Sequence, residues 1–458
     1  MSEQKDFSYT KMPIRPLFFK ISMSMIPATL AISGYNIADT CYIGHLPGAE
    51  SLAAMGFTFP VIMLAGCIFH GFADALMTFT AQLNGAKKQK ATRTFVTAGL
   101  VMLVLIAAFI ALLGVFTCPM LFKLFGASGK TLELAITYMN IWYAGCITII
   151  LALSGNDLLI ACGNPKYAAW MMMLSMLINV ILDPILIFGL GPIPGKGIAG
   201  AAIATILSQG IGAVCILSMA QHKYHLIDFK SLTWKTILLD WKQLFAYAIP
   251  AILGMLLMPI GNAVIIRITA EFGVVAVAAV AAAGRIEMLA FVIPMSVGMA
   301  VMPYMGQNFG AGFYQRIHDG RKFVMRFAFG FLLTSGTLIF LFRRQIVPFF
   351  SIDPAVQEIM IQYLSIVVWG LWGVEVHRFS NFTFTGCGKP KFATFLTIMR
   401  VVLFLIPFAL IALYFHSLKG LFIARFSSDV ISAVIAYFCA HHLTTKLIRE
   451  NKKVELFR

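Results

Sequence analysis

The chain consists of long apolar stretches separated by short polar segments. Stretches such as 21–38, 95–122 and 243–266 carry no charged residue, and at about 1.5 Å per residue each is long enough to cross much of a ~30 Å hydrocarbon core. The pattern predicts helices at 17–40, 52–82, 92–119, 131–161, 165–190, 195–221, 242–268, 274–308, 318–342, 355–386, 391–414 and 419–446. We therefore expect an all-α integral membrane protein with twelve transmembrane helices.

The composition supports lipid as the main solvent of these helices. Hydrophobic residues make up 60% of the chain and charged residues only 12%, whereas soluble domains average about 25% charged residues. The polar segment 1–15 is not followed by a short apolar run with a small-residue cleavage site. We expect no removable targeting segment.

The net charge of +16 would suggest nucleic acid binding in a soluble protein, but here the positions of the charges matter more. If the N-terminus is cytoplasmic, most lysines and arginines fall in cytoplasmic segments. The outer loops then hold only Lys123, Lys130, Lys196, Arg343, Arg344 and Lys419. The positive-inside rule therefore predicts that both termini are cytoplasmic, and we expect no nucleic acid partner.

The second half of the chain repeats the first at an offset of about 225 residues. The matching segments are 81–86 with 306–311, 162–167 with 387–392, 26–27 with 249–250, and 196–197 with 419–420. Each half holds six predicted helices, an even number, so both halves start on the same side and the repeats are parallel. We expect an N-terminal lobe at 1–221, a cytoplasmic linker at 222–241 and a C-terminal lobe at 242–458.

Two carboxylates in the first half stand out because they lie in apolar helices. An unpaired charge at such a depth costs about 2.5–3.5 kcal/mol on insertion scales. Asp39 lies near the outer end of the first helix, and Asp183 shares a helix face with Asn179, four residues before it. Such a group could bind Na⁺ through its oxygens or carry a proton. Alternatively, Asp39 ends a helix near water and Asp183 pairs with a neighbour.

The repeat provides an internal comparison for this site. Aligned with the first half, the second half has Asn262 opposite Asp39, Phe404 opposite Asn179 and Phe408 opposite Asp183. The second half therefore lacks the same group of polar side chains.

The second half has acidic residues of its own in predicted helices. Glu287 and Glu375 have Arg285, Arg378 and Arg400 near them in sequence or potentially in space. We favour structural ion pairs for these residues, because each acid has an arginine nearby. A second polar site formed by Glu287, Glu375 and Arg400 is the alternative.

Several motifs resemble those of the multidrug and toxic compound extrusion (MATE) transporters. They are Tyr35–His45 (YNIADTCYIGH) with 52–56 (LAAMG), GNPK at 163–166, Asn179-x-x-x-Asp183, GAAIAT at 200–205, and the pairs Gln82 with Gly85 and Gln307 with Gly310. The resemblance implies two six-helix lobes around a central cavity. It also implies efflux of organic cations driven by H⁺ or Na⁺ in the inner (plasma) membrane of a bacterium, with a contribution to antibiotic resistance.

The resemblance also implies roles for particular residues. Carboxylates on the first and fifth helices of the family's cation site correspond here to Asp39 and Asp183, with Asn179, Tyr138 and Thr205 as neighbours. For a Na⁺-coupled protein, Asp39, Asn179 and Asp183 would be the metal ligands. Family members bend the first helix at a proline that matches Pro27, although a static kink is an equal alternative.

The expected partners are cationic amphipathic substrates and membrane lipids. We expect a monomer with no cofactor besides the coupling ion. A flippase of lipid-linked sugars is the alternative, because that class needs cations for pyrophosphate and the second half holds several arginines. No nucleotide-binding, zinc-hydrolase or serine-hydrolase motif is evident, so we do not expect an enzyme.

Overall fold

The structure of the protein is a computed structural model. It describes residues 9–46 and 50–456, apart from the side chains of 31–41, 44 and 452–456. Nearly all described residues are helical. The all-α membrane architecture predicted from the apolar pattern is confirmed.

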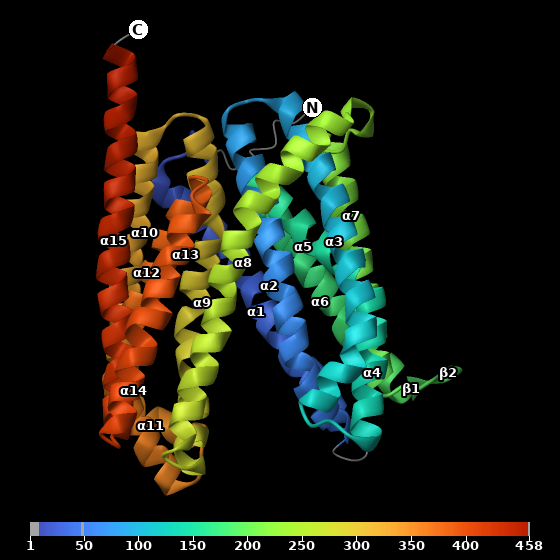
Figure 1. Ribbon diagram of the computed structural model, residues 1–458, viewed down its shortest axis with the longest axis vertical. Coiled ribbons are helices and arrows are strands. Elements are labelled where there is room, and N and C mark those ends of the chain that lie inside the picture. Colours follow the sequence, from blue (N-terminus) through green and yellow to red (C-terminus); the bar gives the residue numbers. More distant parts are fainter. Residues whose placement is uncertain (1–8, 47–49, 457–458) are drawn as a thin grey trace. The chain divides into compact units, whose positions relative to one another are not determined.

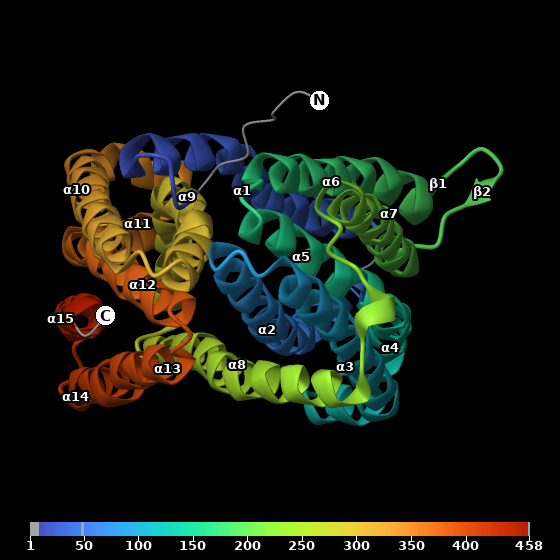
Figure 2. The ribbon, with the colours of Figure 1, turned by 90° about the horizontal axis from the view of Figure 1, so that it is seen from above.

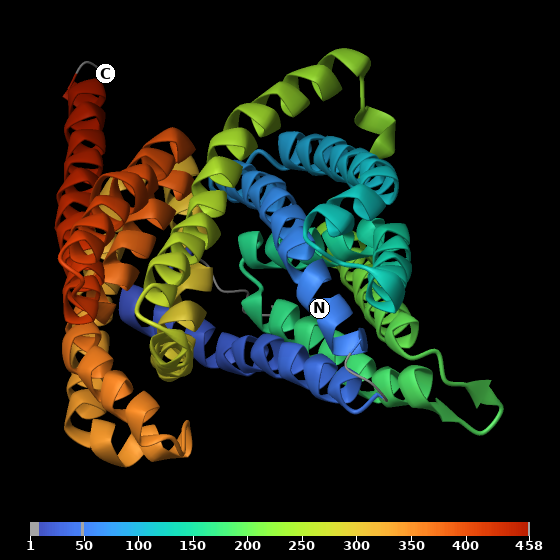
Figure 3. The same cartoon turned by 60° about the horizontal axis from the view of Figure 1, so that its bottom comes forward.

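The helices of the first sequence repeat are α1 (Ile14–Gly44), α2 (Glu50–Gly85), α3 (Gln89–Leu124), α4 (Gly129–Ala144), α5 (Cys146–Ala161), α6 (Pro165–Phe188) and α7 (Ile198–Tyr224). A two-stranded antiparallel hairpin, β1 (Gly189–Leu190) with β2 (Ile193–Pro194), connects α6 to α7. This hairpin projects from the ends of the two helices (Figure 2 and Figure 3). The short 3₁₀ helix η1 (Phe229–Ser231) follows α7.

The second repeat begins with α8 (Trp234–Ala270), α9 (Val274–Gly310), α10 (Tyr314–Ile346) and η2 (Val347–Phe349). It continues with α11 (Pro354–Val367), η3 (Val368–Gly370), α12 (Leu371–Gly386), α13 (Pro390–Ile398), the π-helical segment η4 (Met399–Leu405), α14 (Ile406–Tyr414) and α15 (Leu418–Leu456). Figure 1 shows α15 running the length of the other helices of this repeat.

The helices account for the predicted spans. Among described residues, ten helices are long and apolar enough to cross a membrane, and α4 with α5 forms an eleventh span that is bent by 53°. With the 31 residues of α1, each predicted span has a counterpart. Large apolar side chains such as Phe109, Phe116 and Phe438 are exposed on the helix surfaces, as expected when lipid is the solvent.

The two sequence repeats form the same turn at corresponding positions. Gly163 and Gly388 have φ of +84° and +73°, a region that glycine enters without steric cost. In each repeat a proline, Pro165 or Pro390, begins the next helix. A proline is tolerated there because the first N–H of a helix has no helical partner. The structure therefore agrees with the internal repeat at this turn.

Residue contacts divide the described chain into two compact units. The first unit is Met23–Ala248, and the second contains Tyr9–Ser22 together with the chain from Ile249 onwards. Within the second unit, Arg316 Nη2 donates to the carbonyls of Tyr9 and Met12 at 3.0 and 2.7 Å. Residues 9–22, which belong to the first repeat, lie in the second unit, and residues 242–248, which belong to the second repeat, lie in the first unit. The lobes at 1–221 and 242–458 therefore remain a prediction from the sequence repeat.

Candidate ion-coupling site

The first unit contains the polar pair predicted on the fifth span. Asn179 and Asp183 lie one turn apart on α6, and both side chains have an exposed fraction of 0%. Asn179 Nδ2 donates to Asp183 Oδ1 at 3.5 Å, the long end of hydrogen-bond range. The pair presents amide and carboxylate oxygens inside an apolar helix, a chemistry suited to Na⁺ or to a proton.

The other residues predicted for this site lie on α1, α4 and α7, and the structure describes the side chains of some of them. Tyr138 on α4 and Thr205 on α7 are buried, and α7 packs against both α4 and α6. Asp39 falls within α1, but its side chain lies outside the described residues. Pro27 lies inside α1, where it removes the N–H that would bond to the carbonyl four residues earlier.

A cavity of about 340 Å³ lies between α2, α4, α5, α6 and α7, and its lining on α6 ends one turn before Asn179. Ser175, one turn before Asn179 on α6, and Thr205 both line it. Phe69 and Trp142 form an aromatic wall, with stacked rings 6.4 Å apart between centroids. The cavity therefore joins a polar end near Asn179 to a flat aromatic surface.

The structure adds two acidic residues to the surroundings of this cavity. Asp74 on α2 and Asp157 on α5 are half-buried, and their carboxylates are close enough to interact electrostatically. Neither forms a salt bridge within the described part of the chain. Each is near the cavity, because His70, one turn before Asp74, and Asn156 line it. Their position in apolar spans was a signal available from the sequence.

The two glutamates singled out in the second half are paired with arginines. Glu287 on α9 accepts hydrogen bonds from the Tyr363 hydroxyl at 2.5 Å and from Arg425 Nη2 at 2.6 Å. Sequence proximity suggested Arg285 as a partner. That residue is two positions away on the same helix, and side chains at that spacing do not face each other.

Two further pairs complete this arrangement. Glu375 pairs with Arg378, three residues later on α12. Arg400 in η4 donates to Asp429 Oδ1 on α15 through Nη2 at 2.7 Å and Nε at 3.1 Å. Glu287, Glu375 and Arg400 therefore lie in three separate pairs, although Asp429 also interacts electrostatically with Arg425.

The positions opposite Asn179 and Asp183 in the second repeat carry aromatic rings. Phe404 and Phe408 lie 6.0 Å apart between ring centroids. These side chains offer no oxygen ligand. Among the described residues, the buried amide–carboxylate pair at this repeat position occurs in the first unit only.

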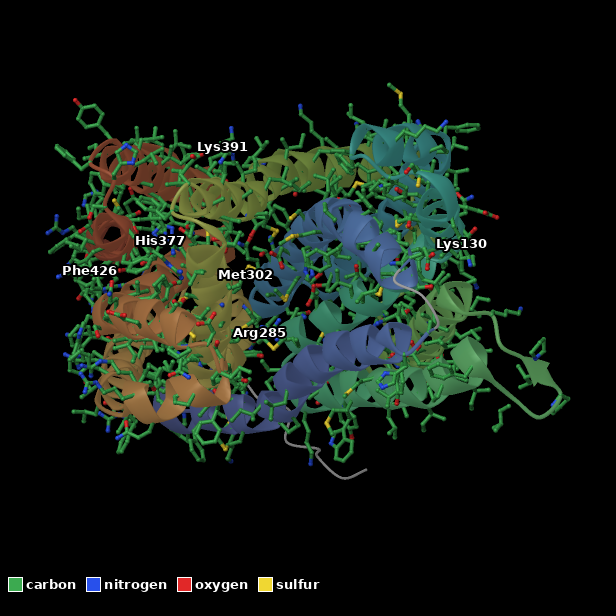
Figure 4. The ribbon with its side chains drawn as sticks, turned by 90° about the horizontal axis from the view of Figure 1, so that it is seen from below. Lys130, Arg285, Met302, His377, Lys391 and Phe426 are labelled. Atoms are coloured by element: carbon green, nitrogen blue, oxygen red, sulfur yellow. The ribbon has the colours of Figure 1, made fainter. Side chains whose placement is uncertain are left out.

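Arg285 differs from the other arginines of the second unit. It is exposed on α9 (Figure 4), within an apolar span. It forms no salt bridge with any described acid. An unpaired arginine inside a span is expected to face water rather than lipid.

The chain is similar to known transporters along nearly its whole length. The sequence model of the MatE family matches residues 25–185 and 250–411. A protein of Shewanella oneidensis named FAD transporter is 30% identical over 437 residues, which cover 94% of this chain and 95% of that protein. The multidrug export protein MepA of Staphylococcus haemolyticus is 25% identical across 98% of both chains.

A solved structure shows the same fold. The crystal structure of a mutant of the Vibrio cholerae MATE transporter VcmN has a TM-score of 0.88 and 25% identity, and covers 94% of this chain and 97% of that chain. The two segments matched by the family model coincide with the two halves of the sequence repeat.

Proposed function

Because this chain belongs to the MatE family of membrane transporters, we propose that it is a secondary active exporter that exchanges an organic solute for H⁺ or Na⁺. The observation that carries this proposal is the fully buried pair of Asn179 and Asp183 on α6, one to two turns from a cavity lined by Ser175 and Thr205. A carboxylate that deep is costly unless an ion or proton neutralises it. The coupling ion would bind there, with Tyr138, Thr205 and Asp39 completing the site.

The proposed setting is the inner membrane of a bacterium, with both termini in the cytoplasm. The charge bias of the loops supports this orientation. We propose that the protein acts as a monomer without a cofactor and does not act as an enzyme. It would confer resistance to the compounds that it exports.

For the substrate, we first propose cationic amphipathic compounds with flat aromatic parts. The aromatic wall formed by Phe69 and Trp142 supports this class, since flat cations bind well over ring faces. The carboxylates of Asp74 and Asp157, close to the cavity without a described cationic partner, would attract positive charge.

A second candidate substrate is a dinucleotide such as FAD. A relative with that name matches nearly the whole chain, and Arg285 offers an exposed, unpaired guanidinium that could bind a diphosphate. A flippase of lipid-linked sugars receives less support, because Arg378, Arg400 and Arg425 are already paired with carboxylates.

Transport by purified protein in proteoliposomes would test these proposals. A pH jump and a Na⁺ jump are applied separately, with a fluorescent organic cation or FAD as the solute. We expect one gradient to drive one class of solute. Failure of both gradients with both solutes would contradict ion-coupled export of these substrates.

The substrate classes can then be separated with Arg285→Gln. Loss of FAD transport with retained cation transport would favour the dinucleotide. An unchanged FAD rate would remove Arg285 from substrate binding. Arg267→Gln is the matched control, because Arg267 is also exposed but pairs with Glu271 at the end of α8.

A further inference from the structure

The second unit contains a cavity of about 330 Å³ between α10, α12 and α15. These three helices pack against one another, and Figure 2 shows them side by side. The cavity is lined by two basic residues of α10 and by aromatic residues of all three helices: Lys322, Arg326, Phe329, Trp372, Tyr437 and Phe438. It is separate from the residues proposed above to bind the coupling ion or the solute.

The basic residues of this cavity are not neutralised by the described acids. Lys322 and Arg326 lie one turn apart on α10, and both are exposed. Neither forms a salt bridge with a described carboxylate. Asp319, the acid of this turn, instead accepts a hydrogen bond from Gln315 at 3.1 Å. Two positive charges therefore remain available to a ligand.

A third cation lies behind the aromatic wall. Arg321 has an exposed fraction of 1%, and its guanidinium carbon is 5.0 Å from the centre of the Tyr437 ring. Its Nη2 lies 3.0 Å from Nδ1 of His441, whereas its Nε and Nη1 donate no hydrogen bond to a described residue. No carboxylate described in the chain pairs with it, so its charge adds to the positive potential around the cavity.

The remaining wall of the cavity is apolar and open to the surroundings. Phe329 and Phe438 are 45% and 63% exposed, and Val434 on α15 is 44% exposed. In the orientation proposed above, the first turns of α10 lie at the cytoplasmic side. A ligand here would meet positive charge at one end and exposed hydrocarbon and aromatic surface along the rest.

From this combination we propose that the cavity binds an anionic phospholipid of the cytoplasmic leaflet. The phosphodiester would lie between Lys322 and Arg326, and an acyl chain would lie along Phe329 and Phe438. Basic pockets between helices on the cytoplasmic side are suited to anionic head groups, with each nearby cation contributing favourably. Tyr437, whose ring faces the guanidinium of Arg321, would lie at the level of the head group, where amphipathic rings are favoured. Trp372 packs against Phe329 with ring centroids 5.1 Å apart, so it would line the acyl chain.

Lipid retention by the purified full-length protein tests this proposal without any transport assay. Native mass spectrometry would compare phosphatidylglycerol with phosphatidylcholine of the same acyl chains. We expect phosphatidylglycerol to bind more tightly, and the double variant Lys322→Gln with Arg326→Gln to lose at least about tenfold in affinity for it. The variant exchanging these two residues for each other, Lys322→Arg with Arg326→Lys, should retain the preference.

The matched control removes the same charge elsewhere in the second unit. Lys389→Gln with Lys391→Gln, at the start of α13, should leave the lipid preference unchanged; Lys391 is labelled in Figure 4. An equal loss of affinity in both double variants would mean that only the overall charge matters, and it would overturn the proposal. So would an unchanged preference in the Lys322 and Arg326 variant. Displacement of the lipid by millimolar inorganic phosphate would show that the site takes free phosphate instead.

Discussion

At the scale of single residues, the first unit keeps a carboxylate where the second unit has an aromatic ring. Asp183 is completely buried beside Asn179, whereas Phe408 occupies the corresponding position of the second repeat. Glu287, Glu375 and Asp429 of the second unit are each paired with an arginine. The two units therefore use buried charge differently: the first buries a carboxylate beside an amide on one helix, and the second uses arginine–carboxylate ion pairs.

We predict that Asp183→Asn abolishes ion-driven efflux and leaves expression near normal. The amide keeps the volume of the side chain but has no negative charge to bind a cation or a proton. Asp39→Asn should act in the same way. Ion-driven solute flux in proteoliposomes is the measurement, and Asp319→Asn, an exposed acid at the start of α10, is the control. A normally transporting Asp183→Asn variant beside a folded but inactive Glu375→Gln variant would move the coupling site to the second unit.

Glu287→Gln should instead lower stability. The Glu287 side chain is 7% exposed and its partner Arg425 is 29% exposed, so the substitution leaves a largely buried arginine uncompensated. We expect a loss of about 2–3 kcal/mol, below the range for fully buried pairs, seen as a lower midpoint of thermal unfolding in detergent. Glu271→Gln, in a pair that is 74% and 48% exposed, should cost less than about 1 kcal/mol. Equal costs for the two variants would contradict this account.

At the scale of elements, the fourth span is broken where α4 and α5 meet. Gly145 lies at the break, and a Cβ on this residue would meet Ile206 Cγ1 of α7 at 2.1 Å. The absence of a side chain therefore lets the bent span approach α7, which carries Thr205. Bends in helices commonly follow from glycine and from close packing of this kind.

Gly145→Ala should therefore destabilise the first unit by about 1–3 kcal/mol, because the added methyl overpacks the contact with α7. Thermal unfolding in detergent would measure the loss. Ile206→Ala in the same chain should restore part of the stability by making room. Gly210→Ala is the control, since its Cβ would lie 3.5 Å from Thr148 Cγ2, an ordinary contact. An unaffected Gly145→Ala variant would show that the contact can relax without cost.

At the scale of the whole molecule, the parallel repeat and the charge bias together predict a topology. The even number of spans in each half predicts the same orientation for both halves, and the distribution of lysine and arginine predicts which side is cytoplasmic. The proposed direction of export rests on this orientation.

Cysteine labelling in cells tests the topology. A cysteine at Ser128, before α4, should react with an impermeant reagent from outside, whereas cysteines at Gln89 and Gln315, at the starts of α3 and α10, should not. The exposed native thiols Cys215 and Cys439 should first be replaced by alanine. The reverse labelling pattern would invert the topology and the proposed direction of transport.

The sequence alone determined the features that follow from local periodicity and from the repeat. The apolar runs predict the spans, because lipid requires an uninterrupted helix to satisfy the backbone. The spacing of Asn179 and Asp183 predicts a shared helix face, because the helical repeat sets that relation. Matching turns at Gly163 and Gly388 follow from matching residues in the two repeats.

Only the tertiary structure decided which helices supply the partners. The pairing of Glu287 with Arg425 and of Arg400 with Asp429 joins residues on different helices, so helical spacing cannot predict it. The same holds for the approach of Asp157 to Asp74 and for the cavity beside Asn179. These relations depend on how side chains of different helices pack, and packing is a property of the folded units rather than of any single stretch of sequence.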